Sequence, residues 1–366
     1  MKLIKYFAGA ALAIIVLVLL TACSTDEING FDPITVDGFR LHPDRHGGFV
    51  IIGYTGPGGA LVIPEEINGS PVTTIGAAAF SSRALTSVVI PNSVTRIGDL
   101  AFNNNRLTSV IIPYRVTFIG ERAFSNNQLT SVNIPDKVSS IGNLAFYRNL
   151  DLNEITVGRN NRHYTSIDGV LFNFNKTRLI LFPPARDDQY VIPHSVTKIE
   201  DMAFAFSRLT SISIGHRVAS IGDGTFAQGH LTSVYIPNSV NSIGDGAFAR
   251  GRLISVYIPN SVTTIGDFAF RHNRLTSVII PDRVTSIGTE VFASNHLISV
   301  VIPNSVTVIG DRAFFDNRLT TIVIGANVEL GAGAFCFSFE STYLFARRAA
   351  GTYTRPNLAS RIWTRR

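Results

Sequence analysis

The sequence predicts a β-rich solenoid in which short strands of successive coils stack in parallel. The first observation is a regular column of phenylalanines that recurs in steps of 22 residues. Because a unit of 22 residues is too short to bury its own apolar side chains, neighbouring units must stack on one another. We therefore expect about eleven to twelve coils of 22 residues each. The column comprises Phe80, Phe102, Phe124, Phe146, Phe204, Phe226, Phe248, Phe270, Phe292, Phe314 and, one residue early, Phe335.

The second and third observations come from the first half of each unit. In the unit Leu231 to Arg252, with Leu231 as position 1, apolar residues fall at positions 1, 4, 6, 10, 13, 17 and 18. Positions 1 to 6 alternate apolar and small polar residues, which is typical of a half-buried strand. A proline at position 7, such as Pro237, ends this strand because proline cannot donate to a strand ladder. Stacked units then form one parallel sheet.

The second half of the unit is expected to turn the chain. Positions 10 to 13 form a second short extended piece. The glycine at position 14, such as Gly244, is expected at positive φ, although Glu200 takes its place once. The aspartate at position 15, such as Asp245, is expected to cap a single helical turn that holds Ala247 and Phe248 inward.

The N-terminal residues form a separate unit. Two lysines precede an apolar run from Tyr6 to Leu20, which is too short to span a bilayer and is typical of a secretory signal peptide over residues 1–22. The ending Leu-Thr-Ala-Cys resembles the bacterial lipobox. This resemblance implies cleavage before Cys23, lipidation of its sulfur and acylation of the new N-terminus. The alternative is an ordinary signal peptide with a coincidental cysteine. Residues 23–30 then form a polar lipidated tether, and Ser24 favours outer-membrane export by resemblance to known sorting rules.

The remaining boundaries follow the repeat. We expect an N-terminal cap over residues 31–70, a first repeat block over 71–152, a longer variant coil over 153–193, a second repeat block over 194–339 and a basic C-terminal cap or tail over 340–366. In the variant coil, Asn175 to Thr177 lie between two apolar runs and predict a hairpin insertion. This insertion is either tolerated on one face of the solenoid or a distinct recognition feature.

The repeat motif itself resembles a known family. Leu-Thr-Ser-Val-x-Ile-Pro-x-Ser-Val-Thr-x-Ile-Gly-Asp-x-Ala-Phe is similar to the leucine-rich repeat of BspA-like bacterial surface proteins, also found in treponemes, over about residues 60 to 345. The stretches that start at Phe49 and end near Trp363 resemble the caps of such proteins. The resemblance implies a leucine-rich-repeat solenoid, display at the cell surface and adhesion. One departure is the absence of the cysteine column that many members carry near position 20.

Catalytic and metal chemistry find no support in the sequence. No zinc-protease, nucleophile-elbow or phosphate-loop motif occurs, and the eight histidines do not share one column. The formal charge is +6, but six arginines and a single glutamate lie in residues 340–366, so the body is nearly neutral. A nucleic-acid binder needs its positive charge on the working face. We therefore expect no enzyme, no metal, no cofactor and no nucleic-acid partner, and we expect Cys336 to be a buried small hydrophobe.

The candidate binding face is the outward side of the first strand. Positions 3 and 5 point away from the core in an alternating strand. Position 3 is mostly serine, whereas position 5 is mostly apolar or aromatic, where water favours polar groups. A competing interpretation is that β-branched residues simply suit a flat sheet. The predicted partner-binding residues are Val89, Ile111, Tyr235, Tyr257, Ile279, Val301 and Val323, with Ser233, Ser255 and Ser277.

The sequence as a whole favours a cell-surface, lipid-anchored protein that binds a macromolecular protein partner. The family resemblance makes adhesion to host matrix proteins or to other cells the natural expectation, at an outer membrane and facing outward. The rival hypothesis is a structural cell-envelope component whose exposed stripe associates with a second copy. Position 22 carries a basic column, including Arg252 and Arg274, which is either a solvated edge or an attractant for acidic partners. The ligand, the orientation of the lipoprotein and the oligomeric state are left open.

Overall fold

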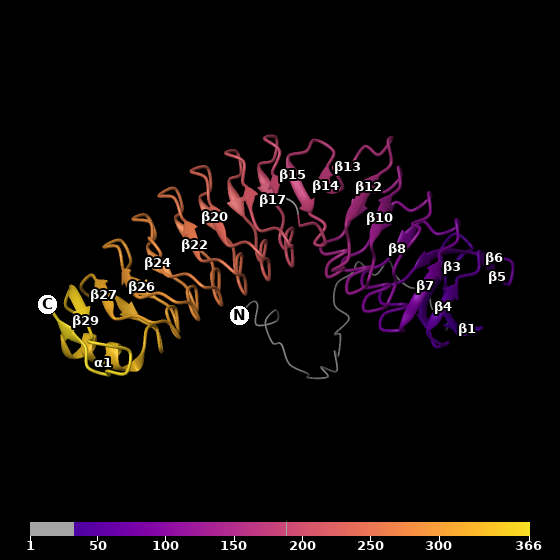
Figure 1. Ribbon diagram of the computed structural model, residues 1–366. Coiled ribbons are helices and arrows are strands. Elements are labelled where there is room, and N and C mark those ends of the chain that lie inside the picture. The colour runs from indigo at the N-terminus through magenta and orange to yellow at the C-terminus, as the bar shows by residue number, and fades with distance from the viewer. Residues whose placement is uncertain (1–32, 188) are drawn as a thin grey trace.

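The computed structural model describes residues 33–187 and 189–366, so the expected signal peptide, Cys23 and the tether lie outside the described residues. The described chain is a solenoid of about 13 stacked coils, slightly more than the sequence predicts. Successive coils follow one another along an arc, with a cap at each end (Figure 1). The β-rich fold expected from the 22-residue period is confirmed.

The coils carry two sets of short parallel strands, at positions 3 to 6 and 12 to 13. In the first set, β20 (Ser233–Tyr235) pairs with β22 (Ser255–Tyr257). The other members are β7 (Leu85–Val89), β10 (Ser131–Ile134), β12 (Glu154–Val157), β16 (Tyr190–Val191), β18 (Ile212–Ser213), β25 (Ser299–Val301) and β27 (Thr321–Ile324).

The second set forms the longer ladders. The sheet that runs through β8 (Arg96–Ile97), β9 (Phe118–Ile119) and β11 (Ser140–Ile141) continues the N-terminal cap. Two further sheets follow in the second repeat block and divide between Ile265 and Ser286. The strands at positions 3 to 6 pair mostly in twos, so the second set is the more continuous one. Its other members are β17 (Lys198–Ile199), β19 (Ser220–Ile221), β21 (Ser242–Ile243), β23 (Thr264–Ile265), β24 (Ser286–Ile287), β26 (Val308–Ile309) and β28 (Glu329–Leu330).

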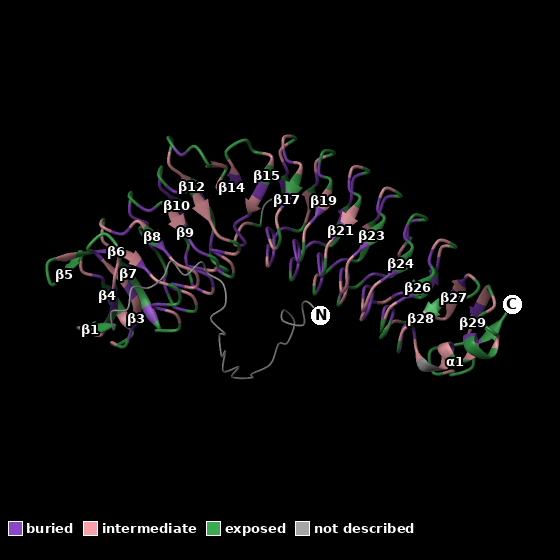
Figure 2. Ribbon diagram, turned by 180° about the vertical axis from the view of Figure 1, so that it is seen from behind, coloured by how far each residue is buried: buried purple, intermediate pink, exposed green. Residues whose placement is uncertain are grey.

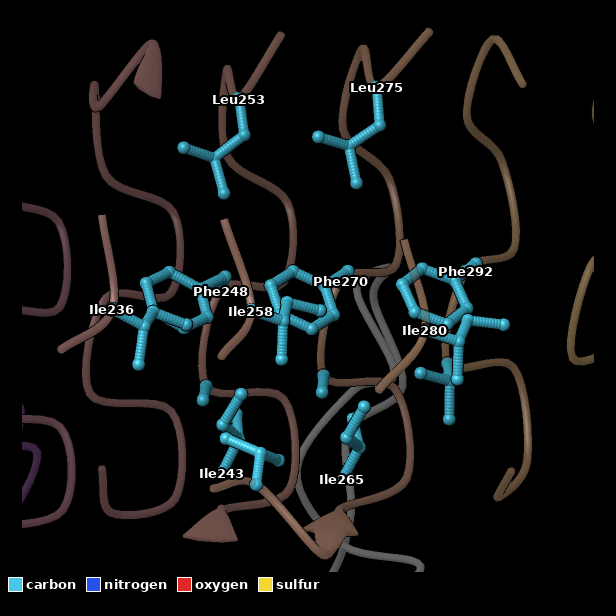
Figure 3. Packing of buried hydrophobic residues seen from close by; sticks show 14 of the residues in the cluster. Ile236, Ile243, Phe248, Leu253, Ile258, Ile265, Phe270, Leu275, Ile280 and Phe292 are labelled. Carbon is cyan, nitrogen blue, oxygen red and sulfur yellow. The ribbon is translucent and has the colours of Figure 1, made fainter. Parts of the chain in front are cut away.

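Phenylalanine rings stack in a column through the core. The centroids of Phe248 and Phe270 lie 5.2 Å apart, and those of Phe270 and Phe292 lie 5.4 Å apart, with nearly parallel planes (Figure 3). Leucine and isoleucine columns flank the rings (Figure 3), and many loops at the outer edge of the arc are exposed (Figure 2). Each stacked ring removes its face from water and adds aromatic contact, so a solenoid in strict 22-residue register is stabilised.

Both ends of the phenylalanine column are closed by aromatic side chains. At the N-terminal end, Phe39 and Tyr54 pack against Phe80. At the C-terminal end, Phe339 of helix α1 (Phe337–Phe345) packs edge-on against Phe335. The N-terminal cap contains β1 (Ile34–Val36), β2 (Phe39–Pro43), β3 (Phe49–Tyr54), β4 (Gly59–Val62), β5 (Glu66–Ile67) and β6 (Ser70–Ile75), and the C-terminal cap adds β29 (Gly351–Thr354) and β30 (Thr364–Arg365).

The expected positive φ of the glycine at position 14 is wrong. Positive φ occurs instead at positions 16 and 20, for example at Leu100 and Asn104, where the turned backbone N–H donates to a carbonyl of the next coil. Where glycine occupies position 14, the neighbouring coil lies too close for a side chain, whereas Glu200 follows the longer variant coil. A Cβ added to Gly120 would lie 2.4 Å from the backbone nitrogen of Asp99 in the preceding coil. The close approach of two backbones fixes the residue type.

The aspartates at position 15 also act differently from expectation. Asp223 accepts a hydrogen bond through Oδ1 from the backbone N–H of Asp245, one coil further on, at 2.9 Å. Asp245 accepts from Asp267 in the same way. The carboxylates therefore link successive coils rather than capping a turn of their own coil.

A buried asparagine ladder at position 21 also joins the coils. Asn295 donates through Nδ2 to the carbonyls of Phe270 and Phe292, at 2.9 and 3.1 Å, and accepts from the N–H of Leu275 through Oδ1 at 3.1 Å. These bonds satisfy backbone groups that burial would otherwise leave unpaired. The same residue type recurs at this position as Asn105, Asn127, Asn149, Asn273 and Asn317.

The predicted hairpin insertion is present as three antiparallel strands. β13 (Tyr164–Ile167) pairs with β14 (Val170–Asn173), which pairs with β15 (Arg178–Leu181), and β15 then pairs in parallel with β17. Phe182 restarts the aromatic column here by stacking on Phe204 at 4.9 Å. The described core consists of two apolar clusters that divide at this insertion.

Candidate partner-binding face

The alternation of the first strand places positions 3 and 5 on the outside, as the sequence predicts. In β20, Val234 is buried, while Ser233 and Tyr235 on either side of it are exposed. Strand pairing then aligns equivalent residues of neighbouring coils, so that Tyr235 lies opposite Tyr257. Position 5 therefore becomes a line of side chains along the solenoid.

Four consecutive coils give this line an unbroken apolar section, which we call the apolar stripe: Tyr235, Tyr257, Ile279 and Val301. Their side chains are 60, 46, 79 and 60 % exposed, respectively. Large apolar side chains lose favourable burial when they remain in water. Exposed apolar patches are a common feature of interaction surfaces, so the apolar stripe is the candidate binding face.

The two tyrosines have a defined arrangement. Their ring centroids lie 4.8 Å apart and their planes are within 4° of parallel. Each ring therefore covers one face of the other. Such a pair offers ring edges and two hydroxyl groups to a partner at little cost in side-chain entropy, which is why tyrosine is favoured at recognition surfaces.

The other predicted residues fall into three groups. Val89 and Ile111 are exposed but belong to the N-terminal part of the face, which Asn133 and Thr156 separate from the apolar stripe. Ser233, Ser255 and Ser277 are exposed beside the apolar stripe. Val323 is only half-buried rather than fully exposed, because β27 also pairs with the cap strand β29.

Sequence reasoning missed two exposed apolar residues on this face. Val62 and Val191 occupy position 5 in coils that lack the leading leucine. The Ile-Pro dipeptide that follows both valines marks their register and could have revealed them. Ile254 and Ile298 are also exposed, at position 2, directly before strands β22 and β25.

Arginines recur at position 22 of the coils, and we call this column the basic border. Arg252, Arg274 and Arg318 at position 22 are exposed, and each precedes the position 2 residue of the next coil by two residues. In residues 33–187 and 189–366, none of these three guanidinium groups forms an ion pair with a carboxylate. In the same column, partial burial and the charges of Arg252 and Arg208 lower the pKa of His230. The border is therefore a row of uncompensated positive charge.

Within the described part of the chain, no group of three or more histidine, cysteine, aspartate or glutamate side chains could hold a metal ion. Cys336 is half-buried near helix α1, less enclosed than expected, with its Sγ 3.5 Å from the Ser338 hydroxyl. The described residues also contain no helix long and apolar enough to cross a membrane.

The repeat architecture decides the family. The model of the BspA-type leucine-rich repeat region, which comprises six copies, matches residues 73–185, 188–293 and 220–342. The chain belongs to the BspA-type leucine-rich repeat family. None of the curated proteins compared with the chain matches it.

Solved structures share the fold of this BspA-type protein. A leucine-rich repeat protein from Eubacterium ventriosum is 22 % identical, with a TM-score of 0.55 over 84 % of this chain and 95 % of that one. The pneumococcal vaccine antigen PcpA is 17 % identical, with a TM-score of 0.54 over 78 % of this chain and 88 % of that one. At these identities the likeness concerns the solenoid alone.

Proposed function

We propose that this BspA-type protein is a lipid-anchored surface adhesin that binds a protein partner through the apolar stripe. BspA-type repeats build scaffolds for protein–protein interaction at the cell surface. The observation that carries the proposal is the unbroken exposure of four large apolar side chains on consecutive coils, with two stacked tyrosines at one end. Aromatic residues clustered at the centre of an interface supply most of its binding energy.

The anchor is part of the same proposal. Lipidation of Cys23 and export to the outer membrane would fix the N-terminal cap near the bilayer and leave the stripe free along the solenoid. Two or three acyl chains anchor a protein stably, whereas one does not. Mass spectrometry of the purified protein tests this step. Lipid on the N-terminal peptide is expected, and its loss in a Cys23→Ser variant would confirm the residue, whereas an unmodified Cys23 would contradict the anchor.

The face is tested by charge insertion. Tyr235→Asp together with Tyr257→Asp places two carboxylates in the apolar stripe without touching the core. We expect the double variant to lose at least about tenfold in affinity for immobilised fibronectin or fibrinogen. Both tyrosine rings are then absent from the interface, and binding no longer removes them from water. Tyr114→Asp is the matched control, since Tyr114 is similarly exposed outside the stripe. Equal binding by the double variant and the wild type would contradict the proposed face.

A self-associating envelope component is the competing function. The same apolar stripe could cover its counterpart on a second copy, since a two-fold interface uses one patch twice. Analytical ultracentrifugation of the full chain in detergent separates the two. Concentration-dependent dimers that the double variant abolishes would favour self-association, whereas monomers that bind a matrix protein favour adhesion.

Host adhesion further requires that the solenoid face outward. Protease treatment of intact cells tests this orientation. Digestion of the repeat domain together with other surface proteins supports the proposal, and its survival under those conditions would place it inside the envelope.

A further inference from the structure

The insertion between the two repeat blocks interrupts the stacking of strands after β11, and we call this interruption the fault. The ladder of the first block ends with β11, and the next ladder begins with β13, so no strand continues the sheet between them. A cleft of about 900 Å³ lies at this fault and is lined by residues of both blocks. The blocks remain in contact beside the cleft, since the ring of Tyr147, which also lines it, lies 5.6 Å from the ring of Phe206. The ladder of second-set strands is broken here and again between β23 and β24, but the break after β11 is the one at which a longer coil is inserted.

The last strand of the first block presents unpaired backbone acceptors to this cleft. In a regular coil, the carbonyls of positions 11 and 13 accept from the next coil, as Thr117 does from Ser139 and Ile119 from Gly142. In the described part of the chain, the equivalent carbonyls of Ser139 and Ile141 accept no backbone hydrogen bond from a following coil. Thr263 and Ile265, at the break between β23 and β24, share this feature, but Ser139 and Ile141 line the cleft. The carbonyls of Ser139 and Ile141 belong to residues two apart on an extended strand, so both point to the same side of the strand. Their spacing along the strand is about 6.6 to 6.8 Å.

One donor at the same edge is already satisfied by a side chain. The N–H of Ile141 donates to the hydroxyl of Tyr164 at 2.9 Å, where no further strand supplies a carbonyl. Partial burial raises the pKa of the Tyr164 phenol above its ordinary value, which keeps the hydroxyl neutral at physiological pH. At the edge of β11, the N–H of Ile141 is therefore paired, whereas the carbonyls of Ser139 and Ile141 are available to a new donor.

The walls of the cleft are apolar side chains that the stack covers elsewhere. Ile141 is partly exposed, although the isoleucines at position 13 of other coils are at most 5 % exposed. Leu144 from the first block, and Ile180 and Met202 from the other side, also line the cleft and are partly exposed. Covering this surface would recover the hydrophobic stabilisation that every regular coil gains from its neighbour.

The far wall carries unpaired negative charge. The cations Arg178 and Lys198 both bind the carboxylate of Glu200. Asp201, Asp223 and Asp245 also line the cleft, and no ion pair in the described ranges engages these three carboxylates. Partial burial raises the pKa of Asp201 and Asp245, and the charge of Asp223 between them adds to the rise. A cation placed here would be stabilised by all three.

We propose that the cleft binds an extended, basic peptide segment of a partner protein, which fills the place of the missing strand. Its backbone N–H groups pair with the carbonyls of Ser139 and Ile141, as in recognition by strand addition. Alternate side chains cover the apolar wall around Ile141, and the intervening lysine or arginine side chains face Asp201 and Asp223. This site uses positions 11 to 16 of the coils and is separate from the apolar stripe.

The test uses a defined peptide and the full chain in detergent. The probe is fluorescently labelled Ser-Val-Lys-Ile-Lys-Thr with blocked ends, in which apolar and basic side chains alternate. Fluorescence anisotropy is expected to show saturable binding. An analogue with glutamate for both lysines, and one with N-methylated backbone nitrogens, should each bind at least about tenfold more weakly, since the first reverses the charge match and the second removes the donors.

Variants then locate the site. Asn143→Trp places a large ring in the cleft from an exposed lining residue, and Asp201→Asn with Asp223→Asn removes two charges while keeping the oxygen acceptors. Both are expected to weaken peptide binding at least about tenfold. Asp311→Asn is the matched control, because Asp311 links coils in the same way outside the cleft. The proposal is overturned if the lysine peptide shows no saturable binding, or if binding is unchanged in Asn143→Trp.

The two proposed surfaces can fail independently. Tyr235→Asp with Tyr257→Asp is expected to leave peptide binding unchanged, and Asn143→Trp is expected to leave binding of the matrix protein unchanged. Loss of peptide binding in the tyrosine variant would overturn the separate cleft site, whatever the outcome for the apolar stripe.

Discussion

Replacing one asparagine of the buried ladder is expected to destabilise the solenoid strongly. In Asn295→Ala, the carbonyls of Phe270 and Phe292 lose a donor and the N–H of Leu275 loses its acceptor. Each such hydrogen bond contributes about 1 kcal/mol net, and a buried group left unpaired costs about 1 to 3 kcal/mol. We expect the free energy of unfolding to fall by about 3 to 4 kcal/mol, because Asn295 is only 3 % exposed and water has little access.

The assay is denaturant unfolding followed by circular dichroism, with Asn260→Ala as the control. Asn260 is exposed and makes no side-chain hydrogen bond in the described chain, so its replacement should change the unfolding free energy by less than about 0.5 kcal/mol. Asn295→Asp keeps the acceptor for Leu275 but turns acceptor oxygens toward two carbonyls, and it should cost at least as much as alanine. A loss below about 1 kcal/mol in Asn295→Ala, or a well-tolerated aspartate, would refute the reasoning.

Three further outcomes follow from the packing and the charges. Gly120→Ala should destabilise the fold by about 3 kcal/mol or more, because its Cβ would overlap the backbone of the preceding coil. In the control Gly215→Ala, the new Cβ meets only ordinary contacts at 3.6 Å, so the melting temperature should be nearly unchanged. Partial burial favours a raised pKa at Glu200, but the hydrogen bonds from Arg178 and Lys198 outweigh it and lower the pKa. The stabilisation from Glu200 is therefore present above the ordinary glutamate pKa and is lost as the pH falls through the lowered value. Glu200→Gln should lower the free energy of unfolding by about 1 kcal/mol at pH 7 and by less in acid. A difference between the two proteins that does not change with pH would contradict this. Asp245 has a raised pKa, so its ionisation opposes folding. Asp245→Asn should leave the free energy of unfolding at pH 7 unchanged or raise it by about 0.5 kcal/mol or less. A clear loss of stability in a denaturant titration would contradict the raised pKa.

Much of the candidate face could be predicted from the sequence because strand alternation is a local rule. Once Leu231 is taken as position 1, the outward direction of Tyr235 and Tyr257 follows, and both are exposed in the structure. The exposure of Val323 could not be predicted in this way. It depends on the cap strand β29, which comes from a segment with no repeat pattern and pairs with β27.

The sequence by itself determined the 22-residue register, the apolar columns of the core and the outward side of the first strand, since each of these repeats within a single unit. The tertiary structure alone decided what depends on the distance between units. Gly120 is required by the approach of a neighbouring backbone, and Asn295 bridges carbonyls of two coils. The carbonyls of Ser139 and Ile141 are open because no strand of the following coil pairs with β11. Contacts between coils cannot be read from one unit, because they depend on how closely each coil packs against its neighbours.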